Sequence, residues 1–345
     1  MRQPAHGGNL AWAAALAGCP PNAILDFSAS ISPLGPPNSA IAAIKSHIGN
    51  LKHYPDPNYS ELRLALSHFH QLPSEWILPG NGSAELLTLI GRELAQLAAT
   101  ILITPAFGDY YRTLTAYNAK VLECSLSLVI DKRQRTKDKG LLLNNPHNPT
   151  GKLFSRDSIL PYLEQFALVV VDEAFMDFVP PNEEQSLIPV VQEYPNLVVL
   201  RSLTKFYSLP GLRLGYAIAH PDCLAKWQLW RDPWPVNTLA AAAAIAALQD
   251  TEFQQQTWAW LPPARNQLFQ GLAEIPGLQP QASAANFLLV ESQESTSQLQ
   301  QQLLKYHQIL IRDCLSFKEL GDRFFRVAVR QESDNQRLLT ALKES

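Results

Sequence analysis

Short apolar runs alternate with amphipathic stretches through the middle of the chain. Six of these runs are rich in β-branched and other apolar residues and predict strands. Between the turn at residues 80–83 and the first strand, apolar side chains recur at helical spacing. This alternation predicts a mainly parallel sheet that helices cover on both faces. The predicted strands are residues 101–104, 120–124, 141–144, 168–172, 197–201 and 215–219.

A different pattern begins after Trp230. Residues 238–248 are rich in alanine and the stretch that follows is rich in glutamine, so we predict one long connecting helix. Beyond this helix, short apolar runs flanked by amphipathic stretches indicate a smaller α+β unit. Its predicted strands are residues 286–291, 309–312 and 324–329.

The length of 345 residues allows two hydrophobic cores, since single domains are usually shorter. We predict a large α/β domain at residues 45–235. The smaller α+β domain combines residues 236–345 with the N-terminal residues 1–44. An apolar share of 46% with 17% charged residues is typical of globular proteins, and a net charge of −3 favours neither nucleic acid nor an anionic membrane as partner.

The four cysteines are scattered and show neither a CxxC pair nor a histidine at metal-ligand spacing. We therefore expect no metal site and a cytoplasmic location. Residues 10–17 are apolar, and the run LAGC at residues 16–19 resembles a bacterial lipoprotein cleavage box. A single Arg2 precedes them, so we favour a short buried helix. No apolar run is long enough to span a bilayer.

Polar residues follow several predicted strands, at the edge of an open α/β sheet where ligands bind. Asp172 ends an apolar strand, and a buried carboxylate there is costly unless it is paired. A protonated pyridine nitrogen is a suitable partner, and the pairing would keep such a ring an electron sink. A carboxylate that caps the next turn is the alternative.

Lys205 follows the next predicted strand, within the run Ser202-Leu-Thr204-Lys205. Lysines are usually solvated, but hydroxyl and apolar neighbours with Arg213 eight residues later can lower the pKa of an amine and make it nucleophilic. Ser202, Thr204 and Arg213 are suitable ligands for a phosphate dianion, the arginine through its two-pronged guanidinium.

Two loops contain further candidate ligand-binding residues. Gly82 and Ser83 lie in a glycine-rich turn that opens a helix. Free backbone N–H groups and the helix dipole there favour a phosphate, unless Ser83 only caps the helix. Two prolines stiffen the loop NNPHNPTG at residues 144–151. Asn148 in this loop is either a donor to a phenolate oxygen or part of a turn that bonds its own backbone.

Together these motifs resemble the fold-type-I pyridoxal 5′-phosphate (PLP) enzymes of the class I and II aminotransferase family, which have the aspartate-aminotransferase fold. The NPxNPTG loop, the Asp-Glu-Ala strand end and the SxTK lysine occur in the family's order, and the resemblance covers nearly the whole chain. It implies that Lys205 carries the cofactor as a Schiff base. It also implies Asp172 at the pyridine nitrogen and Asn148 at the phenolate oxygen.

The resemblance implies further contacts and a homodimer. Tyr54, in the run HYPD, matches a tyrosine that reaches the phosphate of the neighbouring subunit. The other implied cofactor contacts are Gly82, Ser83, Ser202 and Arg213 at the phosphate and Phe107 stacked on the ring.

Two branches of this family compete: histidinol-phosphate aminotransferases and the L-threonine O-3-phosphate decarboxylases of cobalamin biosynthesis. The run HGGN at residues 6–9 resembles the decarboxylases, and so does Phe175. Aminotransferases usually place a tyrosine there, whose hydroxyl donates to the phenolate oxygen, and phenylalanine cannot donate. Ser30 and Ser32 depart from the decarboxylases, which usually have asparagine. Ser32 remains a candidate substrate contact in an enlarged pocket.

Arg312 and Arg326 each lie on a predicted C-terminal strand, and in both branches residues at these places resemble anchors for the substrate's carboxylate and phosphate. Either arginine alone would suggest a surface ion pair, but two guanidinium groups suit a doubly anionic substrate. Arg330 is either a third anchor or packed beside them. His6 is a candidate phosphate contact, although residues near a terminus are more often exposed.

We therefore expect a PLP-dependent lyase that converts L-threonine O-3-phosphate to (R)-1-amino-2-propanol O-2-phosphate. An aminotransferase of the histidinol-phosphate type is the alternative. The bond that breaks is the one perpendicular to the conjugated plane, and the sequence does not set that torsion. A binding protein that kept the fold without the chemistry is a remote alternative. Loss of the lysine or the acid would mark it, and both are present.

Overall fold

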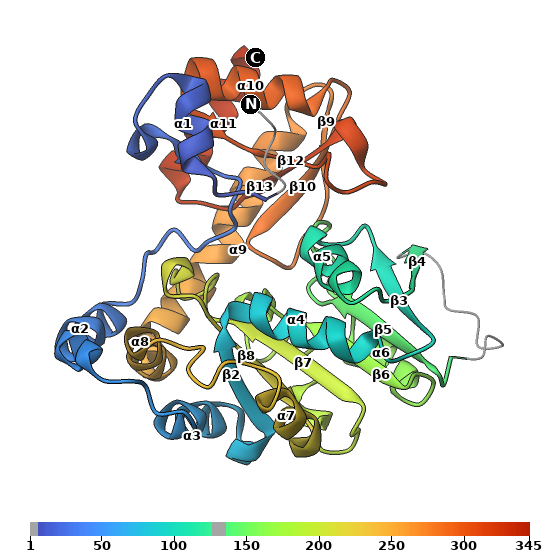
Figure 1. The fold of residues 1–345 in the computed structure, drawn as a ribbon. Helices are drawn as coiled ribbons and strands as arrows, with labels where there is room; N and C mark the ends of the chain where they lie inside the picture. Colours follow the sequence, from blue (N-terminus) through green and yellow to red (C-terminus); the bar gives the residue numbers. More distant parts are fainter. Residues whose placement is uncertain (1–5, 126–135) are drawn as a thin grey trace.

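The computed structural model describes residues 6–125 and 136–345. A seven-stranded sheet forms the lower half of the molecule in Figure 1. Its middle strands are apolar and buried along nearly their whole length, as expected for a sheet covered on both faces. In spatial order the strands are β2 (Ile77–Asn81), β8 (Leu214–Ala219), β7 (Leu197–Ser202), β6 (Leu168–Asp172), β5 (Lys139–Asn144), β3 (Ala99–Thr104) and β4 (Val121–Ser125).

The predicted α/β fold with a mainly parallel sheet is confirmed. β8 runs antiparallel to its neighbours β2 and β7, and the other pairs in this sheet are parallel. All six predicted strands are present with small shifts at their ends. β2 was not predicted, because Pro79 and Gly80 suggested a turn. β2 lies at the sheet edge, where a proline is tolerated because no further strand requires its N–H.

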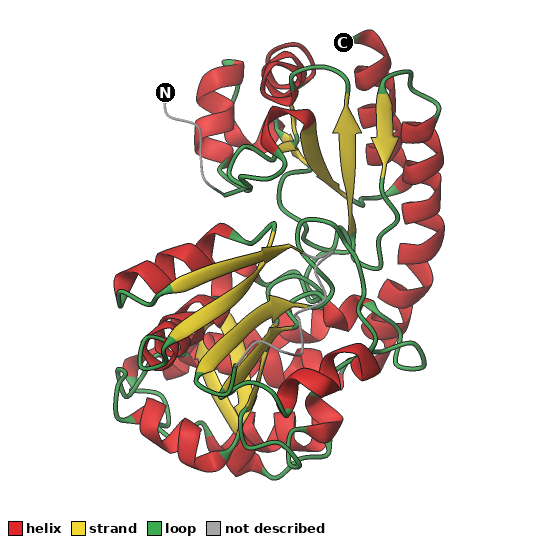
Figure 2. Cartoon of the chain, turned by 90° about the vertical axis from the view of Figure 1, so that its right-hand side faces the viewer, coloured by secondary structure: helices red, strands yellow, loops and turns green. Residues whose placement is uncertain are grey.

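Helices cover both faces of this sheet (Figures 1 and 2). Alternate side chains of β6 show the division. Val170 packs in one core with α4, α5 and α7, whereas Val169 and Val171 pack in another with α3, α6 and α8. The helices of the described residues are α1 (Leu10–Ala17), α2 (Asn38–His47), α3 (Ser60–His70), α4 (Gly82–Leu94), α5 (Gly108–Ala116), α6 (Arg156–Leu163), α7 (Pro221–Gln228), α8 (Thr238–Gln249), α9 (Thr251–Ala273), α10 (Thr296–His307) and α11 (Glu332–Glu344).

The upper part of the molecule contains a second, antiparallel sheet (Figure 1). The predicted strand at residues 309–312 is wrong as a single element, because the chain there passes from one sheet to another. Its first half pairs with a strand of the N-terminal segment, a partner far away in sequence. The antiparallel sheet has the order β12 (Arg312–Asp313), β13 (Phe324–Ala328), β10 (Phe287–Ser292) and β9 (Leu278–Pro280), and the short parallel pair is β1 (Leu25–Asp26) with β11 (Ile309–Leu310).

The predicted long connecting helix is two helices, α8 and α9, that meet at Asp250. The ψ angle of 75° at Asp250 is not helical, and its carboxylate accepts from the backbone N–H of Phe253 at 3.0 Å as an N-cap. α8 packs on α2 and α3 beside the large sheet, and α9 runs on to the small one (Figure 1). The domain boundaries at residues 45 and 235 stay a prediction.

The N-terminal helix α1 is present, as the apolar run predicted. Asn9 caps its first turn by accepting from the N–H of Trp12 at 3.0 Å, and Gly18 ends it in the left-handed conformation. Its buried residues Ala13 and Ala14 share a small core with Leu304 of α10. Within residues 6–125 and 136–345, no helix has the length and apolar character needed to cross a membrane.

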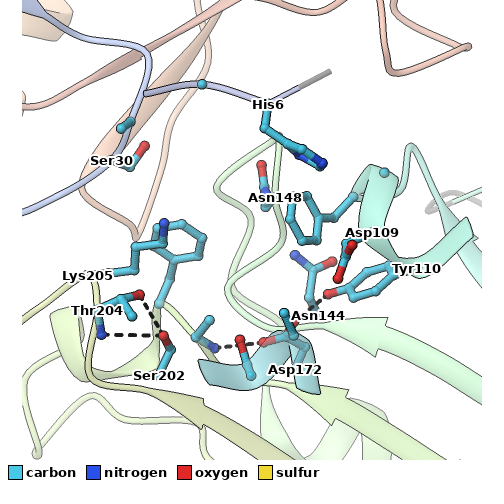
Figure 3. A pocket seen from close by; sticks show the side chains of 18 of the residues that line it. His6, Ser30, Asp109, Tyr110, Asn144, Asn148, Asp172, Ser202, Thr204 and Lys205 are labelled. Carbon is cyan, nitrogen blue, oxygen red and sulfur yellow. Dashed lines mark hydrogen bonds between the residues drawn. The ribbon is translucent and has the colours of Figure 1, made fainter. Parts of the chain in front are cut away.

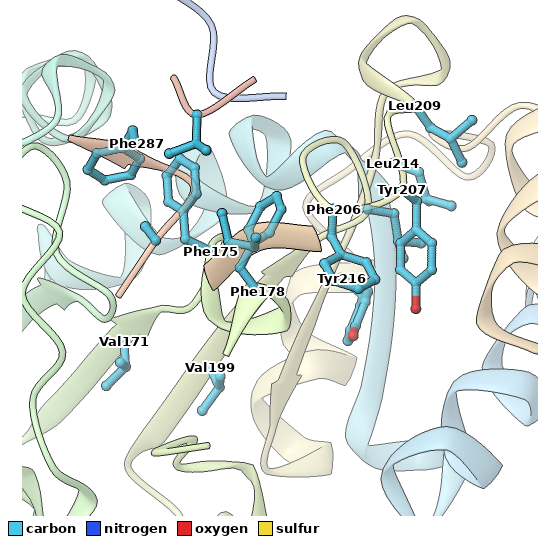
Figure 4. Packing of buried hydrophobic residues seen from close by; sticks show 14 of the residues in the cluster. Val171, Phe175, Phe178, Val199, Phe206, Tyr207, Leu209, Leu214, Tyr216 and Phe287 are labelled. Carbon is cyan, nitrogen blue, oxygen red and sulfur yellow. The ribbon is translucent and has the colours of Figure 1, made fainter. Parts of the chain in front are cut away.

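Aromatic side chains connect the two sheets. In Figure 4, Val171 of β6 and Val199 of β7 lie below a layer of phenylalanines that continues upward to Phe287. Phe175, just after β6, meets Phe287 of β10 edge to face with ring centroids 5.0 Å apart. This contact joins the strand ends of the large sheet to the middle of the small sheet.

A buried ion cluster fixes the ends of β6 and β7. Arg201 of β7 is 2% exposed, and its Nε lies 3.0 Å from Glu173 Oε2. Its Nη1 and Nη2 each lie 2.5 Å from a further carboxylate, of Asp177 and Glu184. Burial raises the pKa of Glu173 to about 7, against the opposing effect of Arg201. Arg201 therefore offsets the free-energy cost of burying the carboxylates of Glu173 and Asp177.

We predict that Arg201→Met lowers the free energy of unfolding by about 3–5 kcal/mol, because it leaves Glu173 and Asp177 buried without their cation. Urea unfolding of the purified variant measures this loss. Lys226→Met is the control, since the Lys226–Glu93 pair (2.8 Å) is partly exposed and should contribute only about 0.2–1 kcal/mol. Similar losses in both variants would show that the cluster has no special role.

Candidate active site

A cavity of about 340 Å³ lies between the strand ends of the large sheet and the small sheet (Figure 3). Its floor is formed where β5, β6 and β7 end, and β12 and β13 contribute residues from the opposite side. This is the edge at which ligands bind in open α/β sheets. The sequence-predicted residues that line it are His6, Ser83, Phe107, Asn148, Asp172, Ser202, Thr204, Lys205, Arg213, Arg312 and Arg326.

Lys205 follows β7 and extends into the cavity (Figure 3). Burial lowers the pKa of its amine to about 8, and the nearby charges of Arg326 and Arg213 act in the same direction. With a pKa of about 8, roughly a tenth of the amine is unprotonated at pH 7, far more than at the ordinary lysine pKa. Lys205 is thus suited to act as a nucleophile.

Asp172, the last residue of β6, is held by two neutral donors. Its Oδ2 accepts from the hydroxyl of Tyr110 at 2.8 Å, and its Oδ1 accepts from the N–H of Ala174 at 3.0 Å. Burial raises the pKa of the carboxyl group, and both hydrogen bonds oppose this. Within the described residues Asp172 has no ion pair. A cationic N–H group in the cavity would complete its environment.

One corner of the cavity contains several hydrogen-bond donors. The hydroxyls of Ser202 and Thr204 lie 2.7 Å apart. A Cβ atom on Gly82 would lie 2.6 Å from Arg213 Nη2, so only glycine lets that guanidinium approach the start of α4. Backbone N–H groups, hydroxyls and a guanidinium make this corner suitable for a phosphate.

Arg312 and Arg326 are directly opposite each other in the ladder between β12 and β13. Residues paired in this way project from the same face of a sheet. Burial lowers the pKa of Arg326 to about 10, and the charge of Arg312 adds to the effect. Two guanidinium groups on one wall repel each other, so an anion beside them is favoured even though Asp313 Oδ2 lies 3.9 Å from Arg312 Nη1.

Neighbouring polar groups orient both arginines. Arg326 donates from Nη1 to Asn148 Oδ1 and from Nη2 to the carbonyl oxygen of Ser28 at 3.2 Å. Arg312 donates from Nη2 to Ser316 Oγ at 2.6 Å. Because Asn148 Oδ1 is the acceptor, the NH₂ group of that amide is left to donate elsewhere.

His6 lies near this wall, with its ring centroid 5.6 Å from that of Phe107 (Figure 3). Burial lowers the pKa of His6, Arg312 lowers it further, and Asp109 raises it. A bound anion would offset Arg312 and favour the protonated ring.

Gly82 lies just behind the lining, beside Arg213, and three further predicted site residues lie away from the cavity. Ser32 is buried, but its hydroxyl accepts from the N–H of Leu34 at 3.4 Å. Arg330 donates from Nε to Asp334 at 2.9 Å, so the guanidinium is engaged elsewhere. Tyr54 is 79% exposed. The structure therefore does not bring Ser32, Arg330 or Tyr54 to the cavity of their own chain, and Ser30 lines it where Ser32 was expected.

Several residues that line the cavity were not predicted as site residues. Tyr110 follows Phe107 by three residues, so helical spacing from the predicted stacking ring would have indicated it. Asn144 opens the NNPHNPTG loop and was available from the same motif. Ser316 and Phe317 lie in the loop between β12 and β13, and no sequence pattern marked them. Asp109, Tyr110, Asn144, Ser30, Ser316 and Phe317 all line the cavity.

Comparison with known proteins identifies the family. The sequence profile of the family described as Aminotransferase class I and II matches residues 22–342. A threonine-phosphate decarboxylase of Salmonella typhimurium is 39% identical, over 98% of this chain and 96% of the relative. A histidinol-phosphate aminotransferase of Symbiobacterium thermophilum is 33% identical, over 90% of this chain and 88% of the relative.

The crystal structure of a histidinol-phosphate aminotransferase from Clostridium acetobutylicum superposes with a TM-score of 0.86 at 30% identity, over 93% of this chain and 98% of that one. This chain therefore belongs to the class I and II aminotransferase family. It is an enzyme of PLP fold type I, and its family is PLP-dependent.

Tyr110→Phe should lower the free energy of unfolding by about 1–3 kcal/mol, because Asp172 stays buried with one donor fewer. The neighbouring Tyr111→Phe is the control. The Tyr111 hydroxyl donates to the partly exposed Glu123 at 2.9 Å, so water can replace the lost partner and the effect should be smaller. Urea unfolding of both apoproteins measures the difference. Equal losses would mean that the Tyr110 hydroxyl does not support Asp172.

Proposed function

We propose that this enzyme decarboxylates L-threonine O-3-phosphate to (R)-1-amino-2-propanol O-2-phosphate. The observation that carries the proposal is the pairing of Arg312 with Arg326 on one wall of the cavity that contains Lys205. A carboxylate and a phosphate on one small substrate match two guanidinium groups beside a nucleophilic amine. The resemblance to the Salmonella threonine-phosphate decarboxylase supports the same reading.

The cavity fits PLP. Asp172, buried without an ion pair among the described residues, would hold the pyridine nitrogen. The corner formed by Gly82, Ser83, Ser202, Thr204 and Arg213 would hold the phosphate. A Cβ atom on Gly215 would lie 2.6 Å from the backbone nitrogen of Ser83, so glycine is required there for the start of α4 to pack this closely on β8.

Two further groups would complete the cofactor site. Phe107, which Tyr110 holds edge-on with ring centroids 5.6 Å apart, would stack on the ring. Asn148 would donate its NH₂ group to the phenolate oxygen, since its Oδ1 is engaged by Arg326.

Bound PLP supplies an electron sink that allows a bond at the α-carbon of an attached amino acid to break. The chain supplies the rest. Lys205 Nζ would hold the cofactor, and as a free amine it would lie beside the α-carbon of the substrate. With a pKa of about 8 it is able to deliver the proton that replaces the lost carbon dioxide. Arg312 and Arg326 hold the anionic groups, and thereby decide which bond at that carbon is aligned for cleavage.

Phe175 favours decarboxylation over transamination. It is buried, lines the cavity and packs against Phe287, so a phenyl ring occupies the place where the aminotransferases usually carry a tyrosine. Without that hydroxyl the phenolate oxygen has one donor fewer. Transamination of histidinol phosphate is the second candidate, because aminotransferases of that name match this chain at 33% and 30% identity.

We also propose a homodimer in the cytoplasm. Tyr54 is exposed and stacks on Trp234 with ring centroids 4.5 Å apart, outside the cavity of its own chain. Ile48 and Leu51 nearby are 53% and 57% exposed, which is typical of a surface that another subunit covers. Tyr54 would reach the phosphate of the partner.

Light scattering should therefore give about twice the chain mass of 38.4 kDa, and a monomer would contradict the proposed dimer.

Borohydride reduction of the holoenzyme should attach the cofactor to the peptide that contains Lys205, and Lys205→Ala should fold but lose this product. In the apoenzyme, the rate of PLP uptake should rise as the pH passes through about 8. The pKa is lowered, so the amine becomes neutral and nucleophilic above that pH rather than near the ordinary lysine value. Stopped-flow absorbance measures the rate. Labelling of Lys152 or Lys226 instead would contradict the assignment.

The substrate prediction is tested with three sets of compounds in parallel. L-Threonine O-3-phosphate should release carbon dioxide, and plain L-threonine should be far poorer because it lacks the phosphate that contributes binding. Histidinol phosphate with 2-oxoglutarate should give little amino transfer. Carbon dioxide and keto-acid formation are followed together. Rapid amino transfer from histidinol phosphate without release of carbon dioxide would contradict this prediction and indicate an aminotransferase.

A further inference from the structure

Three side chains connect the loop between β12 and β13 to the edge strand β4 of the large sheet. Lys318, in this loop, donates from Nζ to Glu123 Oε1 of β4 at 3.1 Å. The same oxygen accepts from the hydroxyl of Tyr111, on α5, at 2.9 Å. Lys318 Nζ also lies 4.8 Å from the centroid of the Tyr111 ring, in a cation–π contact. Each member of this Lys318–Glu123–Tyr111 cluster therefore contacts the other two.

The members of the cluster reinforce one another. The hydrogen bonds from Lys318 and Tyr111 lower the pKa of Glu123, so its carboxylate is charged near neutral pH. Burial raises the pKa of Tyr111, and the hydrogen bond to Glu123 adds to the effect, so the hydroxyl stays protonated and donates. The side chains of Lys318 and Glu123 are 69% and 41% exposed, and such an ion pair contributes little alone. The hydrogen bond and the cation–π contact strengthen it because they share its atoms.

The loop that carries Lys318 is anchored on the small sheet. Phe317 is 4% exposed and packs with Leu289 of β10 in a small core. Near the other end of the loop, Asp322 accepts from the N–H of Ser297, at the start of α10, at 2.8 Å. The contact that Lys318 makes with β4 and α5 therefore restrains one sheet relative to the other.

Both sides of the cluster adjoin residues that line the cavity. Tyr111 follows Tyr110, and Lys318 follows Phe317, so the cluster lies next to one lining residue from each half of the molecule. In Figure 1 the antiparallel sheet lies above α5 and β4, the elements that carry Tyr111 and Glu123. The cluster thus joins the two halves beside the cavity.

Arg312 belongs to the same stretch of chain. Its Nη2 donates to Ser316 Oγ at 2.6 Å, two residues before Lys318. Arg312 and Arg326 lie on the small sheet, whereas Lys205 follows β7 of the large sheet. A ligand that contacts all three is held between the two sheets, and it leaves when the sheets separate.

We propose that Lys318 is a positioning residue that holds the small sheet closed on the large sheet while an anionic ligand occupies the cavity. The proposal rests on the proposed function, because it takes a ligand with two anionic groups that the arginines of the small sheet bind. Its contact with Glu123 and Tyr111 slows the release of that ligand and keeps Arg312 in place over the cofactor side of the cavity.

The dissociation of 3-phosphonopropionate from the holoenzyme measures this effect. The compound carries a carboxylate and a phosphonate but no amine, so it binds without reacting with the cofactor. Lys318→Met should raise its dissociation rate about three- to tenfold, because the ion pair and the cation–π contact are both lost. A stopped-flow dilution jump, followed through the absorbance of the cofactor, gives the rate.

Two further variants separate the contact from the general attraction for anions. Glu123→Gln changes the net charge in the opposite direction to Lys318→Met, yet it should also raise the dissociation rate, because it weakens the same contact. Lys305→Met removes one positive charge from α10, where Lys305 Nζ lies 5.2 Å from the ring centroid of its neighbour Tyr306. Its dissociation rate should stay within about twofold of wild type, since this contact does not cross to the large sheet.

Rescue and the cofactor spectrum distinguish positioning from a disturbed site. Lys318→Arg should keep slow release, because a guanidinium can retain both the ion pair and the contact with the ring. The double exchange Lys318→Glu with Glu123→Lys should recover most of what each single reversal loses. The absorbance spectrum of the unliganded holoenzyme should match wild type in every variant, since Lys318, Glu123 and Tyr111 do not themselves line the cavity.

An unchanged dissociation rate in Lys318→Met would overturn the proposal. Opposite effects of Lys318→Met and Glu123→Gln would also overturn it, because they would indicate the overall field instead of the contact. An altered cofactor spectrum would assign the effect to a disturbed cofactor site. These rates do not depend on turnover. If carbon dioxide is released but Lys318→Met releases the probe normally, only this inference fails; if no carbon dioxide is released but both variants release the probe faster, only the proposed function fails.

Discussion

The placement of two arginines opposite each other on β12 and β13 is the constraint on which the site depends. Arg312 and Arg326 project from the same face of the small sheet into a largely buried cavity, where like charges repel. Asn148 and the carbonyl oxygen of Ser28 accept from one, and Ser316 accepts from the other. These acceptors fix the arginines but carry no negative charge. Asp313 Oδ2, which lies 3.9 Å from Arg312 Nη1, offsets part of the positive charge of this wall, and an anionic ligand would offset more of it.

The opposite side of the cavity has the reverse imbalance. Asp172 is a buried carboxylate with two neutral donors, and the tyrosine that donates to it also orients Phe107. The next residue, Glu173, forms an ion pair with Arg201, and this pair holds the ends of β6 and β7 together. A ligand that is cationic at one end and anionic at the other therefore meets complementary charges at both walls. This rigidity keeps the charged groups in place without reorganisation when a ligand binds.

Much of this organisation could be predicted from motif residues and strand periodicity in the sequence. The six strands of the large sheet were visible because parallel strands covered on both faces must be apolar throughout. Asp172 was visible because it ends such a strand, and Lys205 and Asn148 because they follow one within four residues. The break at Asp250 was not, since alanine- and glutamine-rich segments both favour a helix and an N-cap is a single polar residue. The division of residues 309–312 between two sheets was hidden as well, because the partner strand β1 comes from the far end of the chain.

The sequence by itself determined the family, the fold class and which residue types stand at the strand ends. These are local properties, set by propensity, periodicity and motif spacing. Only the tertiary structure decided that Ser30 rather than Ser32 lines the cavity, that Arg330 is occupied by Asp334, and that Tyr110 supports Asp172. Whether a side chain faces a cavity depends on the packing of segments distant in sequence. That information is absent from any single stretch of residues and appears only when the two sheets meet.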